Sequence, residues 1–144
     1  MKEACAMRRG VKLVVAMTLL LALVAGVAYA GTIEGGPGDD TLIGTEIQDT
    51  ILGKGGDDTI SGLGQSDTLL GQFGNDTING GPGQDVLRGN DGDDDLTGGP
   101  DETKGPRITD EYFCGPGVDT VHLEKSESAV HNISNTCEII IRNE

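Results

Sequence analysis

The chain has 144 residues and a formal net charge of −14, from 24 Asp and Glu against 10 Lys and Arg. This balance excludes a nucleic-acid binder that acts through a basic surface, because phosphate recognition requires clustered Lys and Arg. Aromatic residues make up 3% of the chain and Trp is absent, so a conventional hydrophobic core is not expected to be the main source of stability.

Residues 1–30 have the features of an export signal. Three positive charges lie within residues 8–12, Leu13 to Val24 is almost entirely apolar, and Ala28-Tyr29-Ala30 supplies the small residues that precede signal-peptidase cleavage. The sequence therefore predicts a signal peptide over residues 1–30 and a mature chain that begins at Gly31.

An uncleaved membrane anchor is the alternative interpretation of the same segment. Leu13 to Ile33 carries no charge and is roughly long enough to span a bilayer. In both interpretations the rest of the protein lies outside the cytoplasm. We expect a secreted protein with no stable membrane span after cleavage.

A nine-residue repeat follows residues 31–34, which form a short lead-in. Gly opens every unit, at positions 35, 44, 53, 62, 71, 80, 89 and 98. In the first seven units an Asp follows five places later, at positions 40, 49, 58, 67, 76, 85 and 94. Two places further on there is always an aliphatic residue: Leu42, Ile51, Ile60, Leu69, Ile78, Leu87 and Leu96.

The pattern Gly-Gly-x-Gly-x-Asp-x-apolar-x, as in residues 35–43, resembles the calcium-binding nonapeptide repeats of RTX proteins, also called hemolysin-type repeats. The resemblance covers residues 35–104. It implies an all-β fold, a right-handed parallel β-roll, in which six residues of each unit form a turn and three a short strand. Two units would complete one coil.

Elementary geometry agrees with this fold. Gly at the first and fourth places permits positive φ and close backbone approach, and alternation along a strand turns the single aliphatic side chain inward. The stacked Leu and Ile side chains each offer roughly 1.5–3 kcal/mol on burial. Ordering costs roughly 1–2 kcal/mol for every residue, so a further source of stability is required.

Calcium is the predicted source of that stability. Stacked units bring the Asp carboxylates within about 4.8 Å of one another, where they repel. Ca²⁺ reverses this repulsion, since it accepts six to eight carboxylate and carbonyl oxygens in a flexible shell, whereas Mg²⁺ requires strict octahedral geometry. We expect calcium ions to be both the cofactor and the main binding partner.

The two sides of the predicted roll differ in composition. Units that begin at residues 35, 53, 71 and 89 share the first side, and each keeps Gly at its fourth place and Asp at its sixth: Gly38 and Asp40, Gly56 and Asp58, Gly74 and Asp76, Gly92 and Asp94. The candidate ligands of the second side are Asp49, Asp67, Gly83 and Asp85. We expect three good calcium sites on the first side and weak or empty sites on the second, where Ile47 and Gln65 replace Gly.

Outward-facing residues suggest other interpretations of the same repeats. Four apolar residues lie at turn or outward positions: Ile47, Leu52, Leu63 and Leu70. They are either scattered surface residues or a strip that binds another segment or a cell-envelope partner. The alternative function is therefore a surface-adhesion or matrix module in which calcium is only structural. The threonines Thr41, Thr50, Thr59, Thr68 and Thr77 raise a weaker third alternative, an ice-binding surface.

Residues 105–144 are predicted to form a C-terminal cap. Cys114 and Cys137 are the only cysteines after residue 30, so in an oxidising compartment a disulfide between them is expected. An intermolecular disulfide and a metal or redox role are the alternatives. Residues 138–141 read as a strand that seals the roll, and the irregular spacing before Asp119 places its metal role in question.

We expect no enzymatic activity, because the sequence lacks a nucleophile elbow, a helical His-Glu-x-x-His motif and a phosphate-binding loop. A secreted hydrolase is the corresponding alternative. The sequence thus predicts an exported protein whose repeats fold on calcium, with an affinity on the order of 10⁻⁴–10⁻³ M.

Overall fold

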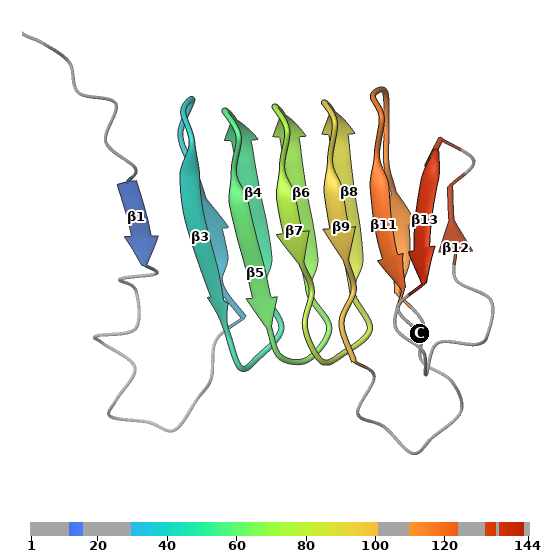
Figure 1. Cartoon of the computed structure of the whole chain (residues 1–144). Helices are drawn as coiled ribbons and strands as arrows, with labels where there is room; N and C mark the ends of the chain where they lie inside the picture. The colour runs from blue at the N-terminus through green and yellow to red at the C-terminus, as the bar shows by residue number, and fades with distance from the viewer. Residues whose placement is uncertain (1–11, 16–29, 101–109, 124–131, 135, 143–144) are drawn as a thin grey trace, which may run out of the picture.

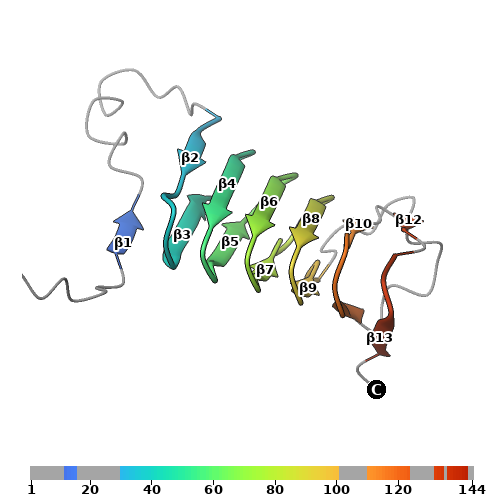
Figure 2. The same cartoon turned by 90° about the horizontal axis from the view of Figure 1, so that it is seen from above.

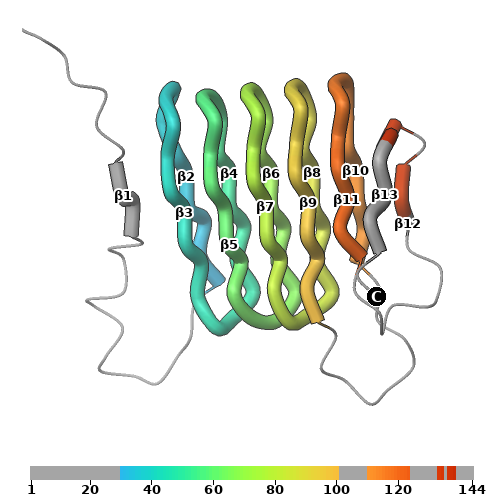
Figure 3. The backbone as a smooth tube through the Cα atoms, viewed as in Figure 1, coloured from blue at the N-terminus to red at the C-terminus, as the bar shows by residue number. Residues whose placement is uncertain are grey.

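The computed structural model describes residues 12–15, 30–100, 110–123, 132–134 and 136–142. All the regular elements of these residues are β-strands, arranged in two parallel sheets that form the two layers of a solenoid (Figures 1 and 2). The chain passes from one sheet to the other and back in each coil, as the tube in Figure 3 shows. The predicted all-β parallel β-roll is confirmed.

Strand order within each sheet follows the coils. The first sheet consists of β1 (Lys12–Val15), β3 (Asp40–Thr45), β5 (Thr59–Leu63), β7 (Thr77–Asn79), β9 (Asp95–Thr97), β11 (Thr120–Leu123) and β13 (Ile139–Arg142), in that order. The second sheet consists of β2 (Thr32–Glu34), β4 (Thr50–Gly55), β6 (Thr68–Phe73), β8 (Val86–Asp91), β10 (Glu111–Phe113) and β12 (Asn132–Ile133), also in that order.

Register confirms that two units make one coil. Thr41 pairs with Thr59 and Thr59 with Thr77 in the first sheet, whereas Thr50 pairs with Thr68 in the second. Within the repeats, paired residues are thus separated by 18 positions, as are the hydrogen-bonded aspartates of successive coils. The five threonines that suggested an ice-binding row are divided between the two sheets.

The core is a single column of aliphatic side chains between the sheets. The seven Leu and Ile residues of the repeats are each at most 1% exposed, which confirms the predicted ladder. Ile33 begins this core and Tyr112, Val121 and Leu123 continue it toward the C-terminus. Each residue lies at an inward position of its strand because alternate side chains of a strand point to opposite faces.

Several strands are longer than the three residues predicted for each unit. β4 continues through Lys54 and Gly55, which belong to the next unit's turn, and these residues pair with Gln72 and Phe73 of β6. The extension arises because successive turns stack in the same register as the strands, so their backbones remain hydrogen-bonded. The strands β7 and β9 keep the predicted length of three residues.

The coils continue beyond residue 104. β10 pairs with β8 and β11 with β9, so residues 110–123 form a further coil of the roll. β12 and β13 add the last strand to each sheet, and the predicted strand at the C-terminal end is confirmed. The Cys114–Cys137 disulfide is present within one chain, with Cα atoms 5.2 Å apart.

The predicted signal peptide lies largely outside the described residues. Its described part, Lys12–Val15, forms β1 and pairs with β3 at the N-terminal edge of the first sheet. Within the described residues, no helix has the length and apolar character needed to cross a membrane.

The apolar outward residues do not form one strip. Leu52 and Leu70 are neighbours on the second sheet, whereas Leu63 pairs with Thr45 at the end of β5. Leu63 is 37% exposed and Ile47 is half-buried in the adjacent turn. This division favours isolated surface residues over a continuous docking strip.

Candidate metal centre

Two ladders of aspartates run along the roll, one at each side. The first contains Asp40, Asp58, Asp76, Asp94 and Asp119, and the second contains Asp49, Asp67, Asp85 and Asp110. Except at the last Asp of each ladder, the backbone N–H of each Asp donates to Oδ1 of the Asp one coil further on. The donor and acceptor atoms are 2.8 Å apart between Asp58 and Asp76, and 3.0 Å apart between Asp94 and Asp119.

Spacing in the sequence places each carboxylate inside the turn. In every repeat the Asp stands two residues before the core aliphatic residue, as Asp76 stands before Ile78. Residues two apart in extended backbone share a face, so the Asp side chain points inward like that of the Leu or Ile. All nine ladder aspartates are buried, with exposed fractions of 6% or less.

Burial leaves carboxylate oxygens without partners. Oδ2 has no hydrogen bond in Asp58, Asp67, Asp76, Asp94 and Asp119. A buried, unpaired anionic oxygen is strongly unfavourable. A positive charge beside these oxygens would compensate them.

The pKa values of the ladder carboxyls also reflect their burial. Desolvation by burial raises the pKa of Asp76 to about 7 and those of Asp67 and Asp94 to about 6. Neighbouring carboxylates add to the rise, and the ladder hydrogen bonds oppose it. Burial also raises the pKa values of Asp58 and Asp119.

These residues fit a hard divalent cation. Among the described residues no group of three or more His, Cys, Asp and Glu side chains is placed to hold a metal ion, so side chains alone would not complete the shell of a bound cation. Carbonyl oxygens of the turns must supply the rest of the shell. Ca²⁺ accepts such a mixture in a flexible geometry, whereas Mg²⁺ prefers to retain water.

The first glycine of each turn adds a steric condition. A Cβ at Gly53 would collide with Oδ2 of Asp58 and would lie 2.8 Å from the carbonyl oxygen of Gly71. Gly at this place therefore leaves space beside the carboxylate. Of the two properties that Gly permits at the first place, the structure uses the close approach, since none of these glycines has positive φ.

Comparison with known families agrees with this geometry. The RTX calcium-binding nonapeptide repeat, in four copies, matches residues 26–46, 43–78 and 70–102, which together exceed half of the chain. The chain belongs to this family. RTX repeats bind Ca²⁺, and proteins that carry them are typically secreted. No curated protein and no solved structure matches the chain.

Positive φ in the RTX turns occurs at the second and fourth places. On the first side these places are occupied by Lys54 and Gly56, Gln72 and Gly74, Asn90 and Gly92, and Gly115 and Gly117. On the second side Leu63 and Gln65 adopt positive φ as Gly81 and Gly83 do. The turn conformation is thus preserved where the consensus glycine is missing, at a conformational cost of roughly 1–2 kcal/mol for a non-glycine residue.

The two N-terminal turns differ from the others. Oδ2 of Asp40 accepts a hydrogen bond from the Gly36 N–H at 2.6 Å, and Oδ2 of Asp49 accepts one from the Thr45 N–H at 2.6 Å. Thr45 Oγ1 also lies 2.7 Å from Oδ2 of Asp49. In these two turns hydrogen bonds satisfy the oxygen that is unpartnered in Asp58 and Asp76.

The predicted ligands therefore differ according to their position along the roll, and not only according to the side on which they lie. Oδ2 of Asp40 and Oδ2 of Asp49 each accept a hydrogen bond from their own turn. Gly38 does not adopt the positive φ of Gly56, Gly74 and Gly92. Asp67 on the second side is as buried as the first-side residues, and Asp85 continues its ladder. The predicted difference in affinity between the sides stays a prediction.

Asp110 and Asp119 are ladder residues that the repeat period did not identify. Each accepts the hydrogen bond of an Asp 25 residues earlier, where the regular interval is 18. The signal that identifies them is the spacing Asp-x-apolar, which both keep, in Asp110-Glu111-Tyr112 and Asp119-Thr120-Val121. The irregular spacing before Asp119 reflects an insertion that the coil tolerates, so Asp119 keeps its place in the ladder.

An outer, exposed ladder lies beside the first ladder of aspartates. Residues at the fifth place of the first-side turns connect in the same way, since Oδ1 of Asp57 accepts from the Asn75 N–H and Oδ1 of Asn75 accepts from the Asp93 N–H. Asn and Asp are both found in this outer ladder because the hydrogen bond needs only a side-chain oxygen. Charge is thus not required at the outer positions.

Proposed function

We propose that this chain is an exported calcium-binding RTX protein whose repeats fold when they bind calcium. The observation that carries the proposal is the set of buried Oδ2 atoms that have no hydrogen-bond partner, in Asp58, Asp67, Asp76, Asp94 and Asp119. A cation bound between coils would satisfy these oxygens and cancel the repulsion along each ladder.

Simple electrostatics supports the coupling of folding to calcium. Two carboxylates about 4.8 Å apart repel by about 0.9 kcal/mol in water and by several times more at an effective dielectric constant near 20. The repulsion accumulates along both ladders, and the slender aliphatic core offers little to oppose it. Because the sites exist only in the coiled chain, calcium stabilises the folded state by mass action.

The ions would be held between successive coils. In the middle of the first side, Asp58, Asp76 and Asp94 would supply carboxylate oxygens, and the Gly-containing turns would supply carbonyl oxygens. What calcium provides there is positive charge and a flexible shell of oxygen ligands. We assign the chain no catalytic role, because these carboxylates are buried between coils, away from any substrate in solution.

Export is supported by two independent features. The N-terminal segment has the charge and apolar pattern of a signal peptide, and the Cys114–Cys137 disulfide is typical of an oxidising compartment. Cell fractionation and N-terminal sequencing test this part of the proposal. A mature chain that starts at Gly31 in the medium is expected.

The calcium part of the proposal is tested by titration of the purified chain. Circular dichroism and calorimetry, at constant ionic strength, should show strand formation on addition of Ca²⁺ but not of an equal concentration of Mg²⁺. Asp76→Asn should remove calcium-binding capacity. Asp57→Asn is the matched control, since Asn75 occupies the equivalent position in the exposed ladder. Full strand content in the presence of a chelator would contradict the proposal.

A further inference from the structure

The C-terminal end of the first ladder is closed by a glutamate. Oε2 of Glu138 accepts a hydrogen bond from the Asp119 N–H at 3.2 Å, as Oδ1 of Asp119 accepts one from the Asp94 N–H. Glu138 directly precedes β13, whose Ile139 pairs with Thr120 of β11. It therefore occupies the place of the next ladder Asp, with a side chain one methylene longer.

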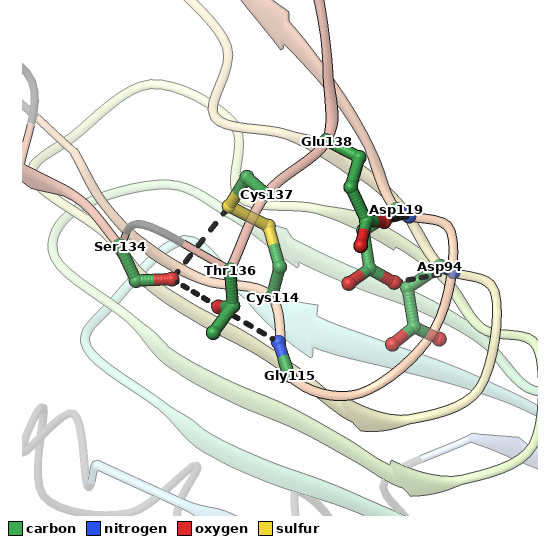
Figure 4. Close-up of a disulfide and its surroundings, with 8 residues drawn as sticks. All are labelled: Asp94, Cys114, Gly115, Asp119, Ser134, Thr136, Cys137 and Glu138. Atoms are coloured by element: carbon green, nitrogen blue, oxygen red, sulfur yellow. Dashed lines mark hydrogen bonds between the residues drawn. A yellow bond between two sulfur atoms is a disulfide. The ribbon is translucent and has the colours of Figure 1, made fainter.

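Asp119 presents an uncompensated carboxylate at this end. Its side chain is fully buried, and its Oδ2 has no hydrogen-bond partner. Burial raises the pKa of Asp119, and the nearby negative charge of Glu138 raises it further. Two carboxylates thus lie near one another at the end of the roll (Figure 4), and that of Asp119 is buried.

Hydroxyl groups take the place of a further turn next to residues 114–119, on the side where another coil would lie. In the regular coils the N–H at the second place of a turn donates to a turn carbonyl of the next coil, as Asn90 does to Cys114 at 2.8 Å. The Gly115 N–H instead donates to Oγ1 of Thr136 at 3.3 Å, and Oγ of Ser134 lies 2.6 Å from that oxygen. Oxygen atoms are therefore supplied by side chains where the repeat has ended (Figure 4).

The disulfide fixes this arrangement. Cys137 immediately precedes Glu138, and Cys114 is the first residue of the turn that ends at Asp119. The bond therefore ties the backbone next to Glu138 to the turn that Glu138 faces, as Figure 4 shows. Cys114 is completely buried, so this attachment point is part of the roll itself.

We propose that Asp119 and Glu138 form a terminal calcium site, positioned by the Cys114–Cys137 disulfide. The site lies outside the residues that match the RTX repeat, which end at 102, and its second carboxylate comes from a Glu instead of a repeat Asp. The inference rests on the proposed calcium binding. It adds that the cap is itself bound to the roll through a cation.

The test compares the full disulfide-bonded chain with Glu138→Gln. Gln keeps an oxygen that accepts the Asp119 N–H but removes the charge, so a merely structural hydrogen bond would survive the change. Glu34→Gln is the matched control, because Glu34 is exposed on the second sheet, where it pairs with Lys54. Calcium stoichiometry is measured by calorimetry, and terbium luminescence serves as an independent probe of the same sites.

We expect Glu138→Gln to bind one calcium ion fewer than the wild type, while Glu34→Gln binds the same number. The double variant Cys114→Ala/Cys137→Ala should keep both carboxylates but weaken the terminal site by roughly tenfold or more, as the loss of a positioning contact does at other metal sites. These results would support the terminal site.

Unchanged stoichiometry and affinity in Glu138→Gln would overturn the terminal site, even if the melting temperature fell, because Glu138 would then be only a hydrogen-bonding cap. If the wild type itself binds no calcium, the proposed function fails and this inference fails with it. Should Glu138→Gln fail to fold, Glu138→Asp, which shortens the reach of the carboxylate, is measured in its place with the same two readouts.

Discussion

The backbone nitrogen of Gly31 lies 3.0 Å from Oδ1 of Asp49. It donates to that oxygen as the N–H groups of Asp49 and Asp67 donate to the next carboxylates of the second ladder. Gly31 is also the residue at which the mature chain is predicted to begin. Cleavage after Ala30 would therefore place a new α-ammonium group at the start of the ladder.

A chain that begins at Gly31 with a free amine should be more stable than the same chain with an acetylated amine. The expected difference is about 1 kcal/mol, because a charged donor strengthens a hydrogen bond to a carboxylate. The advantage requires the protonated amine, so it is present below the ordinary α-amine pKa of about 8 and is lost as the pH rises above that value. Urea unfolding of both forms at pH 7 and pH 10 measures it, and equal stability at pH 7 would contradict the prediction.

Calcium-free stability should fall as the pH rises. The folded-state pKa values of Asp67 and Asp94 are raised from 3.8 to about 6, and that of Asp76 to about 7. The coiled chain therefore retains protons that the unfolded chain releases, so stability is highest below pH 4 and is lost between pH 4 and about 7. The strand content in a chelator, measured by circular dichroism from pH 4 to pH 7, tests this trend.

Asp76→Asn is the control for the pH effect, since it removes the group that titrates at the highest pH. The slope of stability near pH 7 should become smaller in this variant. With calcium present the dependence should reverse, because protons compete with the ion for the carboxylates. Chelated wild type that becomes more stable from pH 4 to 7 would show that the ladder is not protonated in this way.

Calcium binding should depend on the middle turns more than on the first ones. Oδ2 of Asp58 and of Asp76 lacks a hydrogen bond, whereas Gly36 and Thr45 already satisfy Oδ2 of Asp40 and Asp49. Asp58→Ala and Asp76→Ala are expected to reduce calcium uptake strongly, and Asp49→Ala only weakly. Equilibrium dialysis of the three variants makes the comparison, which fails if all three lose the same amount.

Gln72→Gly should stabilise the roll by about 1 kcal/mol. Gln72 has a φ of +87°, a left-handed conformation that costs an ordinary residue roughly 1–2 kcal/mol and glycine very little. Gln84→Gly is the control, because Gln84 is not among the residues with positive φ, and there glycine should destabilise by roughly 0.5–1 kcal/mol. Urea unfolding at saturating calcium distinguishes them, and losses in both variants would contradict the strain.

Removal of the disulfide should lower the stability by about 3 kcal/mol on the chain-entropy account, given the 23 residues that separate Cys114 from Cys137. Cys114→Ala/Cys137→Ala at saturating calcium provides the measurement. Reduction of the wild type with a dithiol should produce a similar loss. If neither treatment shifts the unfolding midpoint, the cap is held by other contacts.

The regular middle of the roll could be predicted from the sequence because its geometry is local and repeated. A Gly, an Asp and a Leu or Ile at fixed places specify the turn, the inward carboxylate and the core residue, and the period of two along a strand does the rest. The seven Leu and Ile residues of the repeats, from Leu42 to Leu96, are accordingly buried as predicted. The disulfide also followed from the cysteine count.

Only the tertiary structure decided how the roll begins and ends. Asp110 and Asp119 join the ladders across an insertion, since hydrogen bonding between coils depends on position in space and tolerates extra residues between coils. Glu138 continues the first ladder although no repeat surrounds it. At the other end, Gly36 and Thr45 satisfy carboxylates that the repeat pattern marks as equivalent to the rest. A repeat specifies what each unit shares with its neighbours, whereas a terminal unit lacks a neighbour on one side, and its contacts are set by whatever segment the folded chain brings there.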